Sequence, residues 1–125
     1  MRGRALIAAA LWFAVSTHAA EPIRGWIETE RSGVNLRFTG FVQSDAAGEI
    51  RFELSVTKQG RSGRSESRQA GRLRLEAGVP RRLSQSSVSI ADGDEYCAQL
   101  ALYQADTLVA RQALTDRGES DSCSD

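Results

Sequence analysis

The stretch Ile50–Thr57, which reads IRFELSVT, decides the fold class because apolar and polar residues alternate along it without interruption. The apolar members of the alternation are Ile50, Phe52, Leu54 and Val56. A period of two is the spacing at which the side chains of a β-strand return to the same face. The stretch therefore predicts a strand with one buried and one wet face, which is typical of an antiparallel sheet.

The same alternation recurs on both sides of this stretch, and clusters of Gly, Ser, Asp and Pro separate the runs as turns. No segment after residue 20 shows sustained helical spacing. The predicted strands span about residues 23–31, 33–43, 48–58, 67–76, 81–90, 94–104 and 107–115. Seven short strands in about 100 residues favour an all-β fold, an immunoglobulin-like antiparallel β-sandwich, with a small barrel as the alternative.

Residues 1–20 have the three parts of a secretory signal peptide. Arg2 and Arg4 form a basic start, the apolar core Ala5–Val15 is too short to span a bilayer comfortably, and small residues precede the expected cleavage after Ala20. An uncleaved membrane anchor is the alternative. The expected organisation is a signal peptide (1–20), a sandwich (21–115) and an acidic C-terminal tail without strand pattern (116–125).

Cleavage removes the only histidine, His18, and leaves basic and acidic side chains nearly balanced. The lack of histidine excludes Ser–His and Cys–His nucleophile pairs and His-ligated metal sites. The balance of charge gives no global attraction to nucleic acid or to a membrane surface. We therefore expect a monomeric protein that is not an enzyme, with no cofactor or metal, no nucleic-acid partner and no membrane insertion. A thiol oxidoreductase or a hydrolase is the enzyme alternative.

Two cysteines remain, Cys97 and Cys123, and export to an oxidising compartment favours a disulfide between them. Tyr96, Ala98, Leu100 and Leu102 share one parity, which would place them in the core and turn Cys97 outward. An outward cysteine can be reached by a tail that carries Cys123. Free thiols or an intermolecular bond are the alternatives. In the last predicted strand, Leu108, Ala110 and Leu114 are expected to share a face.

The stretch Lys58–Gly71, KQGRSGRSESRQAG, connects the third and fourth predicted strands and begins the fourth. Seven arginines and only two acids lie between residues 61 and 82. The arginines are Arg61, Arg64, Arg68, Arg72, Arg74, Arg81 and Arg82. Three of them, Arg68, Arg72 and Arg74, have the parity opposite to Leu73 and Leu75, so we expect them on the wet face of one strand. A solvated face with no function is the alternative reading of such a charge run.

A longer pattern, GxSGxSxxxQxxxLxL, runs from Gly60 to Leu75 and is followed by AxxP and a leucine. In this spacing the chain resembles the curli assembly chaperones CsgC and CsgH. The matching positions are Gly60, Ser62, Gly63, Ser65, Gln69, Leu73, Leu75, Ala77, Pro80 and Leu83. A looser resemblance covers residues 50–114. CsgC carries a Cys-x-Cys pair where this chain has AAGEIR, so the sequence is closer to CsgH and a redox role is in doubt.

The resemblance implies an immunoglobulin-like sandwich in the periplasm that keeps the curli major subunit, CsgA, from forming amyloid before its secretion. Taken with the charge pattern, it suggests that the seven arginines bind the unfolded or early aggregating client transiently, since a basic strand face can steer an acidic chain to the surface. The alternative is an immunoglobulin-like envelope binding or adhesion module without chaperone activity.

Overall fold

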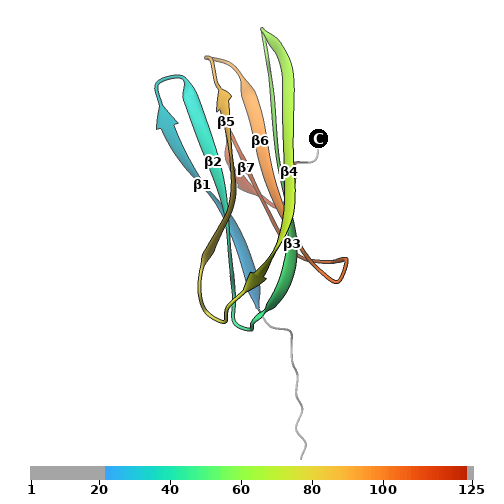
Figure 1. The fold of residues 1–125 in the computed structure, drawn as a ribbon. Coiled ribbons are helices and arrows are strands. Elements are labelled where there is room, and N and C mark those ends of the chain that lie inside the picture. Colours follow the sequence, from blue (N-terminus) through green and yellow to red (C-terminus); the bar gives the residue numbers. More distant parts are fainter. Residues whose placement is uncertain (1–21, 124–125) are drawn as a thin grey trace, which may run out of the picture.

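The computed structural model describes residues 22–123, so the predicted signal peptide and the last two residues lie outside the described part of the chain. All regular structure in this part is β-strand (Figure 1). The strands are β1 (Ile23–Ser32), β2 (Asn35–Ser44), β3 (Gly48–Gly60), β4 (Gly63–Leu75), β5 (Arg81–Ser89), β6 (Glu95–Gln104), β7 (Thr107–Thr115) and β8 (Gly118–Ser120). Within residues 22–123 there is accordingly no helix that could cross a membrane.

The strands form two antiparallel sheets, one in the order β1-β2-β5 and the other in the order β4-β3-β6-β7-β8. The two sheets pack face to face, as Figure 1 shows. This arrangement confirms the predicted immunoglobulin-like sandwich. Both β4 and β5 are end strands of their sheets, which leaves one long edge of each unpaired. That topology sets up the candidate site described below.

The core lies between the sheets and is built from the alternating positions that the sequence marks as apolar. Its largest fully buried side chains are Phe38, Val42, Ile50, Leu54, Val56, Leu100 and Leu102. Burying one such side chain contributes about 1.5–3 kcal/mol to stability. The alternation in Ile50–Thr57 is therefore confirmed as the inner and outer faces of β3.

The prediction that Leu108 shares the buried face is wrong. A β-bulge interrupts the pairing of β6 with β7, because Leu102 pairs with Ala110 whereas Tyr103 pairs with Leu108. One extra residue in β7 changes which face the neighbouring side chains occupy. Leu108 is consequently 44% exposed, while Ala110 and Leu114 pack against the core as expected.

The β3–β4 hairpin is longer than the alternation predicts. β3 continues to Gly60 and β4 already begins at Gly63, so only Arg61 and Ser62 form the turn. Gly63 has a φ of +115°, a backbone conformation that residues with a Cβ rarely adopt. The residues directly after Gly63 are polar on both faces and exposed to solvent. Backbone pairing with β3 holds these residues in a strand. Because they have no apolar face, the alternation of the sequence could not predict this part of the strand.

The segment that follows β7 also differs from its prediction, because β8 pairs with the end of β7 in a short hairpin. The Thr115 hydroxyl accepts a hydrogen bond from the Arg117 backbone N–H (2.9 Å) and donates one to the Gly118 carbonyl (3.1 Å). A turn closed by one threonine side chain carries no periodic signal. The acidic tail therefore contains an eighth, three-residue strand.

Candidate binding surface along β4

The unpaired edges of β4 and β5 face each other along one side of the sandwich, which we call the seam (Figure 1). The two strands contact each other at few points, and side chains make the connections. The bridging pairs are Gln69 Nε2 to the Gln85 carbonyl (2.7 Å), the hydroxyls of Ser67 and Ser86 (2.8 Å), and Arg81 Nη1 to the Arg74 carbonyl (3.2 Å). The seam is thus held by polar contacts and not by a continuous ladder.

The outer face of β4 carries a row of exposed arginines, as the parity of the sequence predicts. The arginine row consists of Arg64, Arg68, Arg72 and Arg74. The alternate residues turn inward, so that Leu73 is half-buried and Leu75 is buried. Because residues two apart in a strand lie about 6.6 Å from each other, the row places positive charge along most of β4.

The positive charge of the row is only partly neutralised. Arg68 Nη2 lies 3.4 Å from Glu66 Oε2, an exposed pair that contributes little to stability. Arg72 stands opposite Arg51 of β3, and Arg51 already pairs with Glu53 at 2.9 Å. Within residues 22–123, neither Arg72 nor Arg74 forms an ion pair. Arg64 forms no ion pair in this part of the chain either, but its Nη1 donates to Gln59 Oε1 at 3.4 Å. The guanidinium groups of Arg72 and Arg74 are therefore the members of the row most available for an external carboxylate or amide.

Arg61, Arg81 and Arg82 do not belong to the arginine row. Arg61 lies in the turn at the tip of the β3–β4 hairpin, and Arg81 spans the seam to β4. Arg82 pairs with Phe41 in the three-stranded sheet and shares its outer face, where Phe41 stacks on Trp26 with ring centroids 5.6 Å apart. The structure thus divides the seven arginines among four locations: the arginine row, the hairpin tip, the seam and the outer face of the three-stranded sheet. Whether any of them binds a client stays a prediction.

The positions that carry the sequence pattern shape the hairpin and the seam. Gly60 is required because a Cβ there would overlap the carboxylate of the buried Asp94. Gln69 supplies a bridge across the seam, and Leu73 packs against the core from the seam side. The remaining pattern residues are Ser62 in the turn, Gly63 just after it, Ser65 opposite Lys58 in β3, and the buried Leu75.

Sequence reasoning missed the role of Gly71. A Cβ at Gly71 would lie 3.0 Å from Cε2 and Cζ of the Phe52 ring, so this glycine lets the aromatic ring approach the backbone of the edge strand. An isolated glycine inside a strand is a recognised sign of such a close approach. The sequence does show a glycine inside the fourth predicted strand. Its partner, the Phe52 ring, could be identified only from the register of β3 with β4, which pairs these two residues.

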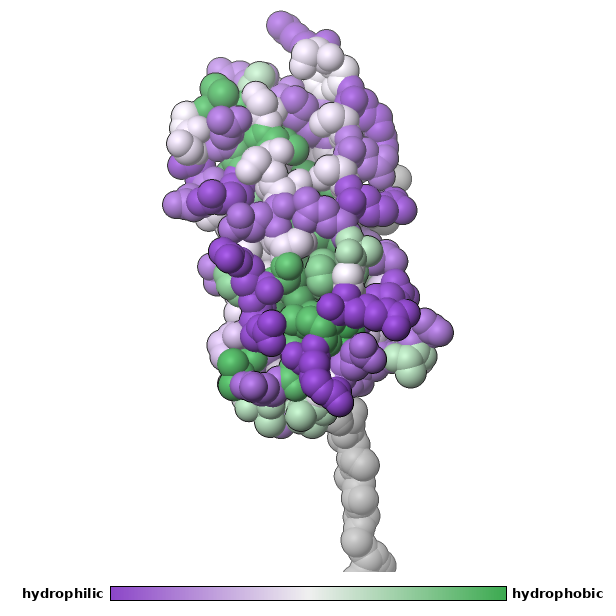
Figure 2. Space-filling model, in the orientation of Figure 1, coloured by the Kyte–Doolittle hydropathy of each residue, from purple (hydrophilic) through white to green (hydrophobic). Residues whose placement is uncertain are grey.

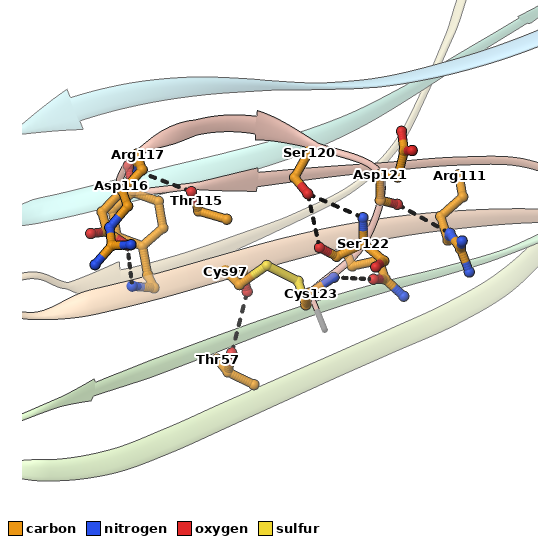
Figure 3. Close-up of a disulfide and its surroundings, with 12 residues drawn as sticks. Thr57, Cys97, Arg111, Thr115, Asp116, Arg117, Ser120, Asp121, Ser122 and Cys123 are labelled. Carbon is orange, nitrogen blue, oxygen red and sulfur yellow. Dashed lines mark hydrogen bonds between the residues drawn. A yellow bond between two sulfur atoms is a disulfide. The ribbon is translucent and has the colours of Figure 1, made fainter. Parts of the chain in front are cut away.

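The predicted disulfide between Cys97 and Cys123 is confirmed. Figure 3 shows how it ties the segment after β8 to β6. The Cys123 backbone N–H donates to Gln99 Oε1 (2.8 Å), and Arg111 Nε donates to the Asp121 carbonyl (3.1 Å). The last described residues therefore lie along the outer side of the five-stranded sheet. Because β3 separates β6 from β4, the disulfide belongs to a different part of this sheet from the arginine row.

Taken together, the site is a basic edge strand on an immunoglobulin-like sandwich. It offers unpaired backbone groups and guanidinium groups, which are means of binding an extended chain. Two solved structures share this fold. The structure of R. palustris CsgH has a TM-score of 0.59 and 19% identity, over 75% of this chain and 90% of CsgH. The structure of the E. coli curli protein CsgC has a TM-score of 0.66 and 21% identity, over 74% of this chain and 97% of CsgC.

No protein-family model matches the chain, and no curated protein matches its sequence. At these identities the likeness to CsgH and CsgC establishes a shared fold. They agree with the resemblance suggested by the Gly60–Leu75 pattern, which was based on spacing and not on overall similarity. Each of the two structures is matched over nine tenths or more of its length, so the likeness covers the whole sandwich and not one hairpin.

Proposed function

We propose that this protein is a periplasmic chaperone that delays amyloid formation by the curli major subunit, CsgA, by binding unfolded or early aggregating chains transiently along β4. The observation that carries the proposal is the exposed arginine row on an unpaired edge strand, in a fold shared with CsgH and CsgC. The Cys97–Cys123 disulfide is consistent with an oxidising compartment such as the periplasm.

Transient binding is sufficient for this function. Amyloid grows by adding strands to exposed backbone edges, and nucleation depends on rare early conformers. Charged groups that steer a chain to a surface increase the association rate more than the residence time. A small protein that meets these conformers often, and releases them as soluble chains, lengthens the lag before fibres appear without being consumed.

The test is a fibrillation assay with purified mature protein. Substoichiometric protein is expected to lengthen the lag of CsgA fibrillation, followed by thioflavin fluorescence. An unchanged lag at equimolar protein rejects the function. The variant Arg72→Glu/Arg74→Glu reverses the charge of two adjacent members of the arginine row. It should lose about tenfold in potency, which corresponds to about 1.4 kcal/mol of binding free energy.

A matched control changes the same amount of charge elsewhere. Arg24 and Arg31 are exposed on β1, at the opposite side of the sandwich. The variant Arg24→Glu/Arg31→Glu should therefore inhibit fibrillation as the wild type does. Full inhibition by the Arg72→Glu/Arg74→Glu variant removes the assignment of the site to β4. Equal losses in both variants indicate a general effect of net charge.

A second candidate function has its own structural support. The stacked Trp26–Phe41 pair, with Arg82 beside it, forms a half-exposed aromatic surface on the three-stranded sheet. Such a surface suits an envelope binding or adhesion module, because aromatic rings supply contact area at low entropic cost. The indole N–H signal of Trp26 in the NMR spectrum discriminates the two candidates. CsgA bound along β4 should leave this signal in place, whereas a CsgA-induced shift of it would favour binding at the aromatic pair.

A further inference from the structure

The bridges across the seam reveal which backbone groups of β4 point outward. The Arg74 carbonyl accepts a hydrogen bond from Arg81 of β5, so it points away from β3. In a strand, the N–H and C=O of one residue point to the same edge, and this direction alternates along the chain. The residues with the parity of Arg74 therefore direct their backbone groups to the free edge. These residues are Arg64, Glu66, Arg68, Ala70 and Arg72.

The two edges at the seam are not equally available. On β5, the carbonyls of Gln85 and Ser89 already accept hydrogen bonds from Gln69 and Lys58. On β4, only the Arg74 carbonyl accepts a hydrogen bond from across the seam. From Arg64 to Arg72, the outward backbone groups have no partner within residues 22–123. This open edge is longer than an average strand of about five or six residues.

Apolar surface lies beside the open edge. Leu73 of β4 and Leu83 of β5 are partly buried and pack against the core from the two sides of the seam. Figure 2 shows apolar surface between the two strands in the lower half of the molecule, flanked by strongly hydrophilic side chains. Because the side chains of an added strand would alternate between the two faces of the sheet, one face would meet the arginine row. The other face would meet the polar bridges of Ser67 and Gln69 and, at the Arg72 end, this apolar strip.

We propose that the edge of β4 between Arg64 and Arg72 binds an extended segment of the client as an added strand of the five-stranded sheet. This inference rests on the proposed function and specifies its contacts. The segment it fits carries acidic or amide side chains toward the arginine row, polar side chains opposite Ser67 and Gln69, and an apolar side chain at its end beside Leu73. Backbone hydrogen bonds supply affinity in this mode of recognition, and the side-chain pockets supply selectivity.

The arginine row also opposes pairing of this edge with a second copy of this chain. Two β4 strands paired edge to edge would bring their arginine rows together on one face, which is unfavourable for like charges. Charged residues on an edge strand are a known protection against such pairing. The same charges attract a segment that carries carboxylates. The arginine row thus disfavours self-association through this edge and favours an added strand that carries carboxylates.

The substitution Ala70→Pro tests strand addition without a change in charge. Ala70 points its N–H to the free edge, so proline removes no hydrogen bond with β3, and proline is tolerated at such edge positions. The missing N–H and the ring would block an added strand. We expect Ala70→Pro to need about tenfold more protein than the wild type for the same delay of CsgA fibrillation. The control Ala70→Val keeps the N–H and should behave as the wild type.

Amide hydrogen exchange of the wild-type protein provides a second measurement that needs no variant. Freshly desalted, monomeric CsgA should slow exchange at the amides of Arg68, Ala70 and Arg72 by about tenfold or more, because each becomes part of a ladder. Full inhibition by a folded Ala70→Pro variant overturns the inference, as does unchanged exchange at these three amides.

The failure of this inference is distinguishable from the failure of the proposed function. If the wild type delays fibrillation and Arg72→Glu/Arg74→Glu does not, while Ala70→Pro remains fully active, the arginine row acts without strand addition. Only the inference is then lost. If the wild type causes no delay at all, the proposed function itself is lost, and the inference with it.

Discussion

The two long sides of the sandwich are closed in different ways. On one side, β1 packs closely against β6 and β7, and a Cβ on Gly25 of β1 would lie only 2.7 Å from Leu102 Cδ1. On the other side, β4 and β5 meet at few points through exposed or half-exposed polar side chains. The first side resembles a protein interior, and the second resembles an interface without its partner. The contrast suggests that stability is concentrated on the β1–β7 side and binding on the seam.

The largest difference between the sides should appear when leucines are truncated. Leu100 is fully buried beneath β1, whereas Leu73 is only partly buried at the seam. Leu100→Ala should lower the free energy of unfolding by about 3 kcal/mol, because it leaves a cavity in packed surroundings. Leu73→Ala should lower it by about 1 kcal/mol, because less surface returns to water. Urea denaturation of the mature variants measures both values, and equal losses would show that the seam is packed as tightly as the β1–β7 side.

Removal of the disulfide should affect stability but leave the seam intact. In the double variant Cys97→Ser/Cys123→Ser, the free energy of unfolding should fall by about 2–3 kcal/mol, because the crosslink restricts the unfolded chain. Its delay of CsgA fibrillation should be retained, since the bond is on β6 and the arginine row is on β4. The fibrillation assay is run at a temperature at which circular dichroism shows the variant to be folded. Loss of inhibition under that condition would move the site away from the seam, toward the last residues or the sulfur atoms.

The smallest difference concerns one polar bridge on each side. Gln112 Oε1 of β7 accepts a partly buried hydrogen bond from the backbone N–H of the core residue Ile27 at 2.9 Å. Gln69 Nε2 donates to the exposed Gln85 carbonyl at 2.7 Å. Gln112→Ala should lower the free energy of unfolding by about 1–2 kcal/mol, because it leaves a partly buried donor without a partner. Gln69→Ala should lower it by about 0.5–1 kcal/mol, because water can replace the lost donor. Thermal melts of the two variants give the ranking, and a larger effect at Gln69 would contradict the view of the seam as an open edge.

The sequence predicted those parts of the fold that depend on side-chain alternation. The run Ile50–Thr57, the inward parity of Leu100 and the outward parity of Cys97 all follow from a period of two, and each agrees with the structure. Parity also predicted the exposure of the arginine row. The predictions failed where alternation is interrupted or absent, at the bulge that exposes Leu108 and in the polar extension of the β3–β4 hairpin.

What the sequence alone determined is therefore the class of fold, the disulfide and the location of excess positive charge, because each is encoded by residue type and spacing along the chain. Tertiary structure alone decided that β4 ends its sheet opposite β5, that Arg82 lies on a different surface from Arg72, and that Gly71 meets the Phe52 ring. The physical reason is that strand order and register depend on how two sheets bury a common core. Strand order and register are therefore fixed by contacts between residues that are far apart in the chain.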